Sequence, residues 1–211
     1  MFSLAAYEYH RNKIYMRVTR RNLRDNLDPF DMPDERFREM YRFPRSLALR
    51  FLDLVSAKMD GGPCPGIPMT IQFCSVLNFY ASGSYQRRVG SDAFAMMSQS
   101  LVSKCVRAFS YMITTEIMDE FVQFPQTAGE IQILHDELQQ HFDYPGAFAF
   151  VDGSLIGLAA VSHLIEQVHV CRKSFHAINT QFVCDVRMRF LSVNARYPGS
   201  CHDALIWRAS L

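Results

Sequence analysis

Several features that would assign a function at once are missing from this sequence. No apolar run reaches the roughly 18 residues of a membrane span, and the start of the chain lacks the pattern of a secretory signal. The six cysteines are scattered, without the C-x-x-C pair typical of a zinc or redox centre. We therefore expect a soluble intracellular protein with free thiols, and no membrane as a partner.

The common catalytic motifs are missing as well. The sequence contains neither G-x-x-x-x-G-K-[ST] nor G-x-G-x-x-G, and no G-x-S-x-G elbow surrounds Ser154 or Ser200. Cys171 has no recognisable base motif beside it. His135 and His141 are six residues apart on an expected helix and face different directions, which does not suit zinc. These absences argue against nucleotide-driven chemistry, serine or cysteine hydrolysis, and a zinc centre.

The net charge of +1 conceals an uneven distribution along the chain. Residues 10–24 contain no acid and carry six basic residues: Arg11, Lys13, Arg17, Arg20, Arg21 and Arg24. Residues 108–171 contain acids but no Lys or Arg. The first segment is a candidate phosphate-binding arm, whereas DNA would not lie along the second without metal or basic neighbours.

Helical periodicity dominates residues 1–145, which we expect to form one helical region. The pattern predicts a helix from Pro44 to about Asp60, a buried helix over 70–81 and a short helix over 92–97. It also predicts a helix over 128–142 whose inward residues are Ile131, Leu134, Leu138 and Phe142.

Ser98 is a suitable N-cap for a long helix that follows the expected short one. Its apolar face comprises Leu101, Val102, Cys105, Phe109, Met112, Ile113 and Ile117. Lys104 and Arg107 fall on the opposite face. A short helix, a turn and a longer helix with a basic face form a helix-turn-helix pattern, so these two residues are candidate DNA contacts. Most such helix pairs are packing units only, and the pattern leaves that alternative open.

The pattern changes after Pro145 and Gly146. Residues 147–160, 178–186 and 190–197 are three candidate strands, and 203–209 is a candidate helix. The fold class is therefore α+β, with a helical region over 1–145 and a strand-containing region over 146–211.

Two acids in the second region could carry chemistry. Asp152 interrupts an apolar strand, where a buried charge needs a metal or hydrogen bonds, although an aspartate that starts a turn with Gly153 is equally common. Asp203 is three residues after Ser200, which is also the spacing of a capping box. Together, two carboxylates at neighbouring strand ends could hold a divalent cation, as phosphoryl transfer requires.

Three ordered motifs resemble the Harbinger-type transposase-derived nucleases, within the DDE superfamily endonucleases. They are VDGS at 151–154, CRKSFHAINTQ at 171–181 and PGSCHDA at 198–204, and residues 79–86 and 97–106 resemble that family's helical region. The resemblance implies part of an RNase H-like mixed sheet with helices, preceded by a helix-turn-helix-like DNA-binding region. It also implies that Asp152 and Asp203 are catalytic ligands of Mg²⁺ or Mn²⁺, whereas Lys173, His176, Asn179 and Gln181 match family positions without an assigned role.

The same resemblance implies DNA as substrate, a Myb-like DNA-binding protein as partner, and the nucleus, or alternatively the cytoplasm, as location. Two departures stand out. Ser154 and Leu155 replace the family's Thr-His, and its remaining acids would lie after Leu211. We therefore expect weak or no cutting by these 211 residues, either as a fragment or as a domesticated remnant. A non-catalytic DNA-binding or interaction module, or a decayed element without function, are the alternatives.

Overall fold

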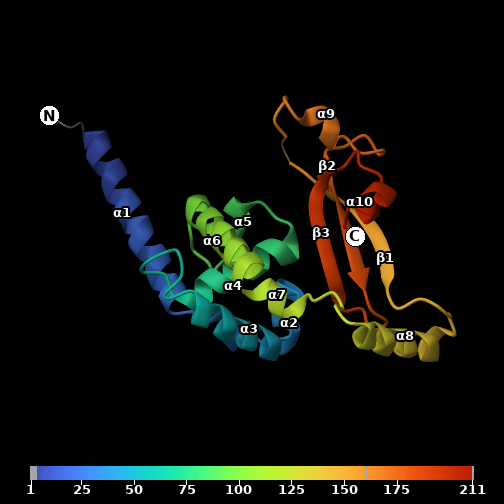
Figure 1. Cartoon of the computed structure of the whole chain (residues 1–211). Helices are drawn as coiled ribbons and strands as arrows, with labels where there is room; N and C mark the ends of the chain where they lie inside the picture. Colours follow the sequence, from blue (N-terminus) through green and yellow to red (C-terminus); the bar gives the residue numbers. More distant parts are fainter. Residues whose placement is uncertain (1–3, 160, 211) are drawn as a thin grey trace. The chain divides into compact units, whose positions relative to one another are not determined.

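The structure is a computed structural model that describes residues 4–159 and 161–210, and its contacts divide the chain into two compact units, 1–117 and 118–211. The first unit is helical (Figure 1). Its elements are α1 (Leu4–Asp25), η1 (Pro29–Asp31), α2 (Asp34–Tyr41), α3 (Arg45–Lys58), α4 (Met69–Ser82), α5 (Gln86–Gly90), α6 (Gln99–Met112) and the π-helical turn η2 (Ile113–Ile117). None of the described helices combines the length and apolarity that crossing a bilayer requires.

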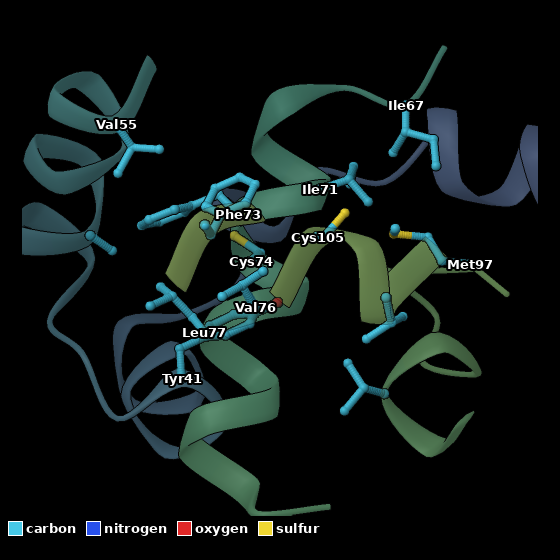
Figure 2. Packing of buried hydrophobic residues seen from close by; sticks show 14 of the residues in the cluster. Tyr41, Val55, Ile67, Ile71, Phe73, Cys74, Val76, Leu77, Met97 and Cys105 are labelled. Atoms are coloured by element: carbon cyan, nitrogen blue, oxygen red, sulfur yellow. The ribbon is translucent and has the colours of Figure 1, made fainter. Parts of the chain in front are cut away.

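Helix α4 lies at the centre of the first unit, as its apolar sequence predicts. Seven consecutive residues, 71–77, are buried, and the core around them includes Val55 of α3 and Cys105 of α6 (Figure 2). Phe73 and Phe109 are at most 1% exposed. Burial of one such side chain stabilises the fold by about 1.5–3 kcal/mol, so this cluster is the main source of the unit's stability.

A buried glutamine fixes the loop between α3 and α4. Gln72 Nε2 donates to the carbonyl oxygens of Gly61, Cys64 and Ile67 at 3.1, 3.2 and 2.8 Å, and its Oε1 accepts from the backbone of Cys64 at 3.0 Å. A buried backbone N–H or C=O without a hydrogen-bond partner would destabilise the fold. The side chain of Gln72 provides these partners and so holds residues 61–67 in place.

Of the two helices in the expected helix-turn-helix pattern, the structure contains the longer one where predicted. Helix α6 begins after Ser98, whose side chain accepts from the backbone of Leu101, and the predicted apolar face is buried or partly buried. The predicted short helix over 92–97 is wrong: the short helix is α5, and turns follow it. The side chain of Asp92 accepts from the backbone of Phe94 at 3.0 Å, as at a helix start, but Met96 has a left-handed φ of 42° and the segment stops after a single turn.

The second unit combines helices with one sheet. Its elements are α7 (Met118–Phe121), α8 (Ala128–Phe142), β1 (Phe150–Gly157), α9 (Glu166–His169), β2 (Ala177–Cys184), β3 (Phe190–Pro198) and α10 (Asp203–Ser210). Helix α8 starts at a capping box between Thr127 and Glu130, as the sequence favours. The predicted α+β class is confirmed.

The sheet has the order β1-β2-β3 and differs from expectation in two ways. Both described strand pairs are antiparallel, so the mixed pairing that we expected is not found among the described residues. As an outer strand, β1 is largely exposed, and Asp152 with it, so the expectation of a charge in a buried strand is wrong. Phe142, expected to face inward, is 62% exposed and contacts the ring of Phe150 edge to face.

The turn between β2 and β3 is closed by a buried carboxylate. Asp185 Oδ1 accepts from the backbone of Arg187 at 2.9 Å and of Arg189 at 2.8 Å, and its Oδ2 accepts from the Arg189 guanidinium at 2.7 Å. Burial of this carboxylate acts to raise its pKa, but the hydrogen bonds and charge of Arg189 outweigh burial and lower the pKa below its usual value.

We predict that Asp185→Asn lowers the free energy of unfolding by about 2 kcal/mol near neutral pH, because a charged acceptor of several hydrogen bonds is lost. Since the pKa is depressed in the folded protein, the stabilisation is present above pH about 4 and lost as the pH falls through the folded value. Urea unfolding of the full chain at pH 7 and pH 3 measures both effects. An equal loss from Asp53→Asn, an exposed acid, would contradict this role.

Candidate active site

The turn before α10 brings Asp203 back to the sheet. Strand β3 ends at Pro198, and the backbone of Gly199 donates to the carbonyl of Ala177 at 2.8 Å. A side chain at position 199 would come within 2.8 Å of the carbonyl oxygens of Ala177 and His169. The glycine therefore allows residues 199–202 to lie against β2, and α10 starts beside that strand with Asp203 as its first residue.

Asn179 of β2 holds the carboxylate of Asp203. Its Nδ2 donates to Asp203 Oδ1 at 2.7 Å and to the carbonyl of Cys201 at 2.9 Å. Asn179 is 4% exposed, so the amide is fixed by burial as well as by both bonds. Asp203 itself is exposed. The capping-box alternative for Asp203 has no support in the described residues, because its carboxylate bonds to Asn179 instead of the backbone of Ser200.

The carboxylate of Asp203 packs directly on the backbone of β1. A Cβ added at Gly153 would lie 2.5 Å from Asp203 Oδ1 and 2.8 Å from its Cγ. Real Cβ atoms do not approach other atoms so closely, so this contact requires glycine at position 153. The residue before this glycine is Asp152, and the two acids, 51 positions apart in the chain, thus meet neighbouring backbone positions of one strand.

Asp152 occupies the other face of β1. Its register partner is Phe182, whereas Gly153 pairs with Gln181, and side chains alternate along a strand. Asp152 Oδ1 accepts from the backbone of Gly153 at 2.9 Å. The structure therefore brings Asp203 to the residue after Asp152 but does not place both side chains in one cavity.

A small cavity of about 60 Å³ surrounds Asp203. Its lining includes Gly153, Asn179, Arg172 and His202, together with residues 199–201. Arg172 lies in the loop before β2 and is exposed, so its guanidinium can reach an anion at the mouth of the cavity. Arginine is well suited to a phosphate oxygen because it offers several donors in a fixed plane.

The remaining family-matched residues contribute differently. Gln181 is buried on the face of β2 that carries Asn179, and Lys173 is exposed in the preceding loop. His176 Nε2 lies 3.1 Å from Glu166 Oε1, so it joins the loop to α9. The candidate DNA contacts Lys104 and Arg107 belong to the first unit, where both are exposed on α6.

The donor chemistry fits a hard divalent cation, although the ligand set is small. Asp152 and Asp203 offer exposed carboxylate oxygens, and Asn179 Oδ1 is buried without a hydrogen-bond partner in the described structure. Mg²⁺ and Mn²⁺ prefer oxygen ligands of this kind. In residues 4–159 and 161–210, however, no group of three or more His, Cys, Asp or Glu side chains is arranged to hold a metal ion.

Comparison with known proteins shows which family the residues around this site resemble. Residues 151–211, which include both acids, match the family model described as "DDE superfamily endonuclease". This match confirms the resemblance to transposase-derived nucleases that the motifs indicate.

The particular relatives are proteins named "Putative nuclease HARBI1". The chain is 31% identical to the protein of Bos taurus and 32% identical to those of Homo sapiens and Rattus norvegicus, in each case over 182 residues. The alignments cover 85% of this chain and 51% of each relative, so the chain spans about half the length of the curated relatives it matches. No solved structure matches.

The contact between Gly153 and Asp203 can be tested by a single methyl group. We predict that Gly153→Ala displaces the Asp203 carboxylate from β1 and weakens binding of Mn²⁺ at least tenfold, because 2.5 Å is too short for any carbon–oxygen contact. Calorimetric titration with Mn²⁺ measures the change. Gly157→Ala on the same strand is the matched control, because a Cβ at position 157 would meet only the side chain of Phe175, at 4.0 Å. Equal Mn²⁺ affinity for the two variants would show that the contact has no part in metal binding.

Proposed function

We propose that this chain belongs to a metal-dependent nuclease that hydrolyses phosphodiester bonds in DNA, with Asp152 and Asp203 as metal ligands. The observation that carries the proposal is the packing of the Asp203 carboxylate on Gly153, the residue that follows Asp152. The match of residues 151–211 to the DDE superfamily endonucleases, and the relatives named as nucleases, support the reaction class.

The cation would be Mg²⁺ or Mn²⁺, and when bound it would polarise the phosphate and lower the pKa of a water nucleophile. The chain's own residues supply the geometry. Asn179 keeps Asp203 Oδ1 against β1, and Arg172 at the same cavity offers a positive charge to a phosphate oxygen. Asp152 precedes Gly153 on the opposite face of the same strand, and its carboxylate would be the second ligand of the ion.

A non-catalytic DNA-binding or interaction module is the second candidate. Two observations favour it. The first unit has a well-packed helical core with Lys104 and Arg107 exposed on α6, and the candidate metal site of the second unit has only two acids. On either proposal the chain would act in the nucleus, with a Myb-like DNA-binding protein as a further proposed partner. Both of these follow from the family resemblance alone.

Plasmid cleavage separates the two candidates. With Mg²⁺ or Mn²⁺ we expect slow nicking by the full chain, and loss of at least tenfold of that rate in Asp152→Ala and Asp203→Ala, because each substitution removes a carboxylate ligand. Calorimetry with Mn²⁺ provides a second readout that does not depend on cutting. Asp119→Ala, an exposed acid on α7, is the matched control. Undiminished cutting and Mn²⁺ binding by both acid variants would end the nuclease proposal.

A further inference from the structure

A groove in the first unit gathers most of the basic arm that the sequence reveals. It has a volume of about 510 Å³ and lies between the C-terminal half of α1, the loop at 65–67 and the start of α6. Four arginines of α1 line it: Arg17, Arg20, Arg21 and Arg24. No described acidic side chain belongs to the lining.

One of these arginines is structural. Arg24 is 7% exposed, and its guanidinium donates to the carbonyl of Gly66 at 3.2 Å and pairs with Asp25 at 2.8 Å. Because Gly66 belongs to the loop held by Gln72, Arg24 fastens α1 to the core of the unit. The groove is thus an anchored feature, although α1 is exposed along most of its length.

The other three arginines are available to a ligand. Arg17, Arg20 and Arg21 are exposed, and only Arg21 has an ion pair among the described contacts, with Asp25 at 3.5 Å. Such an exposed pair is worth little, so Arg21 can exchange its partner. Residues three and four apart share a helix face, and the three guanidinium groups therefore follow one side of α1 over about 6 Å.

The start of α6 adds to the same field. Ser98 and Leu101 line the groove, and the backbone N–H groups of a first helical turn carry partial positive charge. Lys104 follows Leu101 by one turn on α6, so positive groups continue along this helix away from the groove. The arrangement suits a ligand with several negative charges in a row.

We propose that this groove binds the phosphate backbone of double-stranded DNA, with Arg17, Arg20 and Arg21 as phosphate contacts. The proposal rests on DNA as the substrate but assigns a binding site apart from Asp152 and Asp203. The exposed apolar residues Leu4, Tyr7, Ile14 and Val18 share one face of α1, so an anionic membrane surface is the competing ligand that the test has to separate from DNA. Duplex DNA presents one phosphate per about 3.4 Å of each strand, which matches a short row of guanidinium groups.

The test compares two double variants of the full chain that lose the same charge. Arg17→Gln with Arg20→Gln removes two groove arginines, whereas Arg11→Gln with Lys13→Gln removes two exposed cations of the same helix outside the groove. Binding of a labelled 20-base-pair DNA is measured by fluorescence anisotropy in EDTA, which prevents cutting, at several salt concentrations. Lys104→Ala with Arg107→Ala tests α6 in the same assay.

For the groove variant we expect roughly tenfold or greater loss of affinity and a salt slope smaller by about 1.8, since each lost phosphate contact removes about 0.9. The control variant should stay within about twofold of the unmodified chain. If Lys104 and Arg107 also meet phosphates, their variant should lose affinity and flatten the slope in the same way.

Equal losses in the two α1 variants would show diffuse attraction instead of a site and would overturn the inference. Tighter binding of duplex RNA, or binding of anionic phosphatidylserine vesicles without binding of DNA, would overturn it too. Thermal unfolding checks that the variants fold, and the single Arg17→Gln variant gives a second measure of the contact. Groove-dependent DNA binding together with Mn²⁺ binding that is unchanged in Asp152→Ala and Asp203→Ala would end the nuclease proposal alone, whereas cutting with an unchanged groove variant would end this one.

Discussion

The hydrogen bond from Asn179 to Asp203 is the interaction on which the candidate site depends. It joins the middle strand of the sheet to the first residue of α10, and the same amide also bonds to the carbonyl of Cys201. Because Asn179 is buried, neither bond competes freely with water, and the turn at 199–202 is fixed together with the carboxylate. Without this amide, an exposed aspartate at a helix start would have many rotamers, and its position against β1 would not be defined.

Charge divides the chain in a way that any DNA-directed function must accommodate. The first unit carries basic residues on several helices, α1 and α6 among them, whereas residues 108–171 contain no Lys or Arg at all. Basic residues return at Arg172, which lines the cavity of Asp203. The acidic segment repels a phosphate backbone, so attraction near the carboxylates has to come from this loop and from a bound cation. On the proposed function, DNA affinity and phosphodiester chemistry would therefore reside on different residues.

The regular spacing of apolar residues made most helices and strands predictable. Two predictions are wrong, the short helix over 92–97 and the burial of Asp152. Helix α6 follows its apolar pattern and its Ser98 cap, helix α8 follows its apolar pattern, and all three strands begin and end within three residues of the expected runs. The predicted short helix is a single turn because the backbone becomes left-handed at Met96, which an apolar pattern does not reveal. The predicted burial of Asp152 is wrong because a run of apolar residues does not distinguish an outer strand from a central one.

Parts of the site could also be inferred from the sequence, but the roles of two residues could not. Asn179 alternates with Ala177 and Val183 on a buried face, so a polar residue in that pattern signals a required hydrogen bond, yet only the fold names Asp203 as its acceptor. Gly153 looks like a turn residue beside Asp152, and its actual role is steric.

That steric role explains how one strand can serve two acids on opposite faces. A side chain at position 153 would push Asp203 away from β1, and a carboxylate farther out could not approach an ion that Asp152 holds. With glycine there, the carboxylate of Asp203 lies against the backbone position that follows Asp152 in the outer strand. Asp152 and Asp203 would hold the ion through carboxylate oxygens, and Gly153 lets Asp203 stay on the strand that carries Asp152. The proposed metal site therefore depends on Gly153 of the VDGS motif as well as on Asp152.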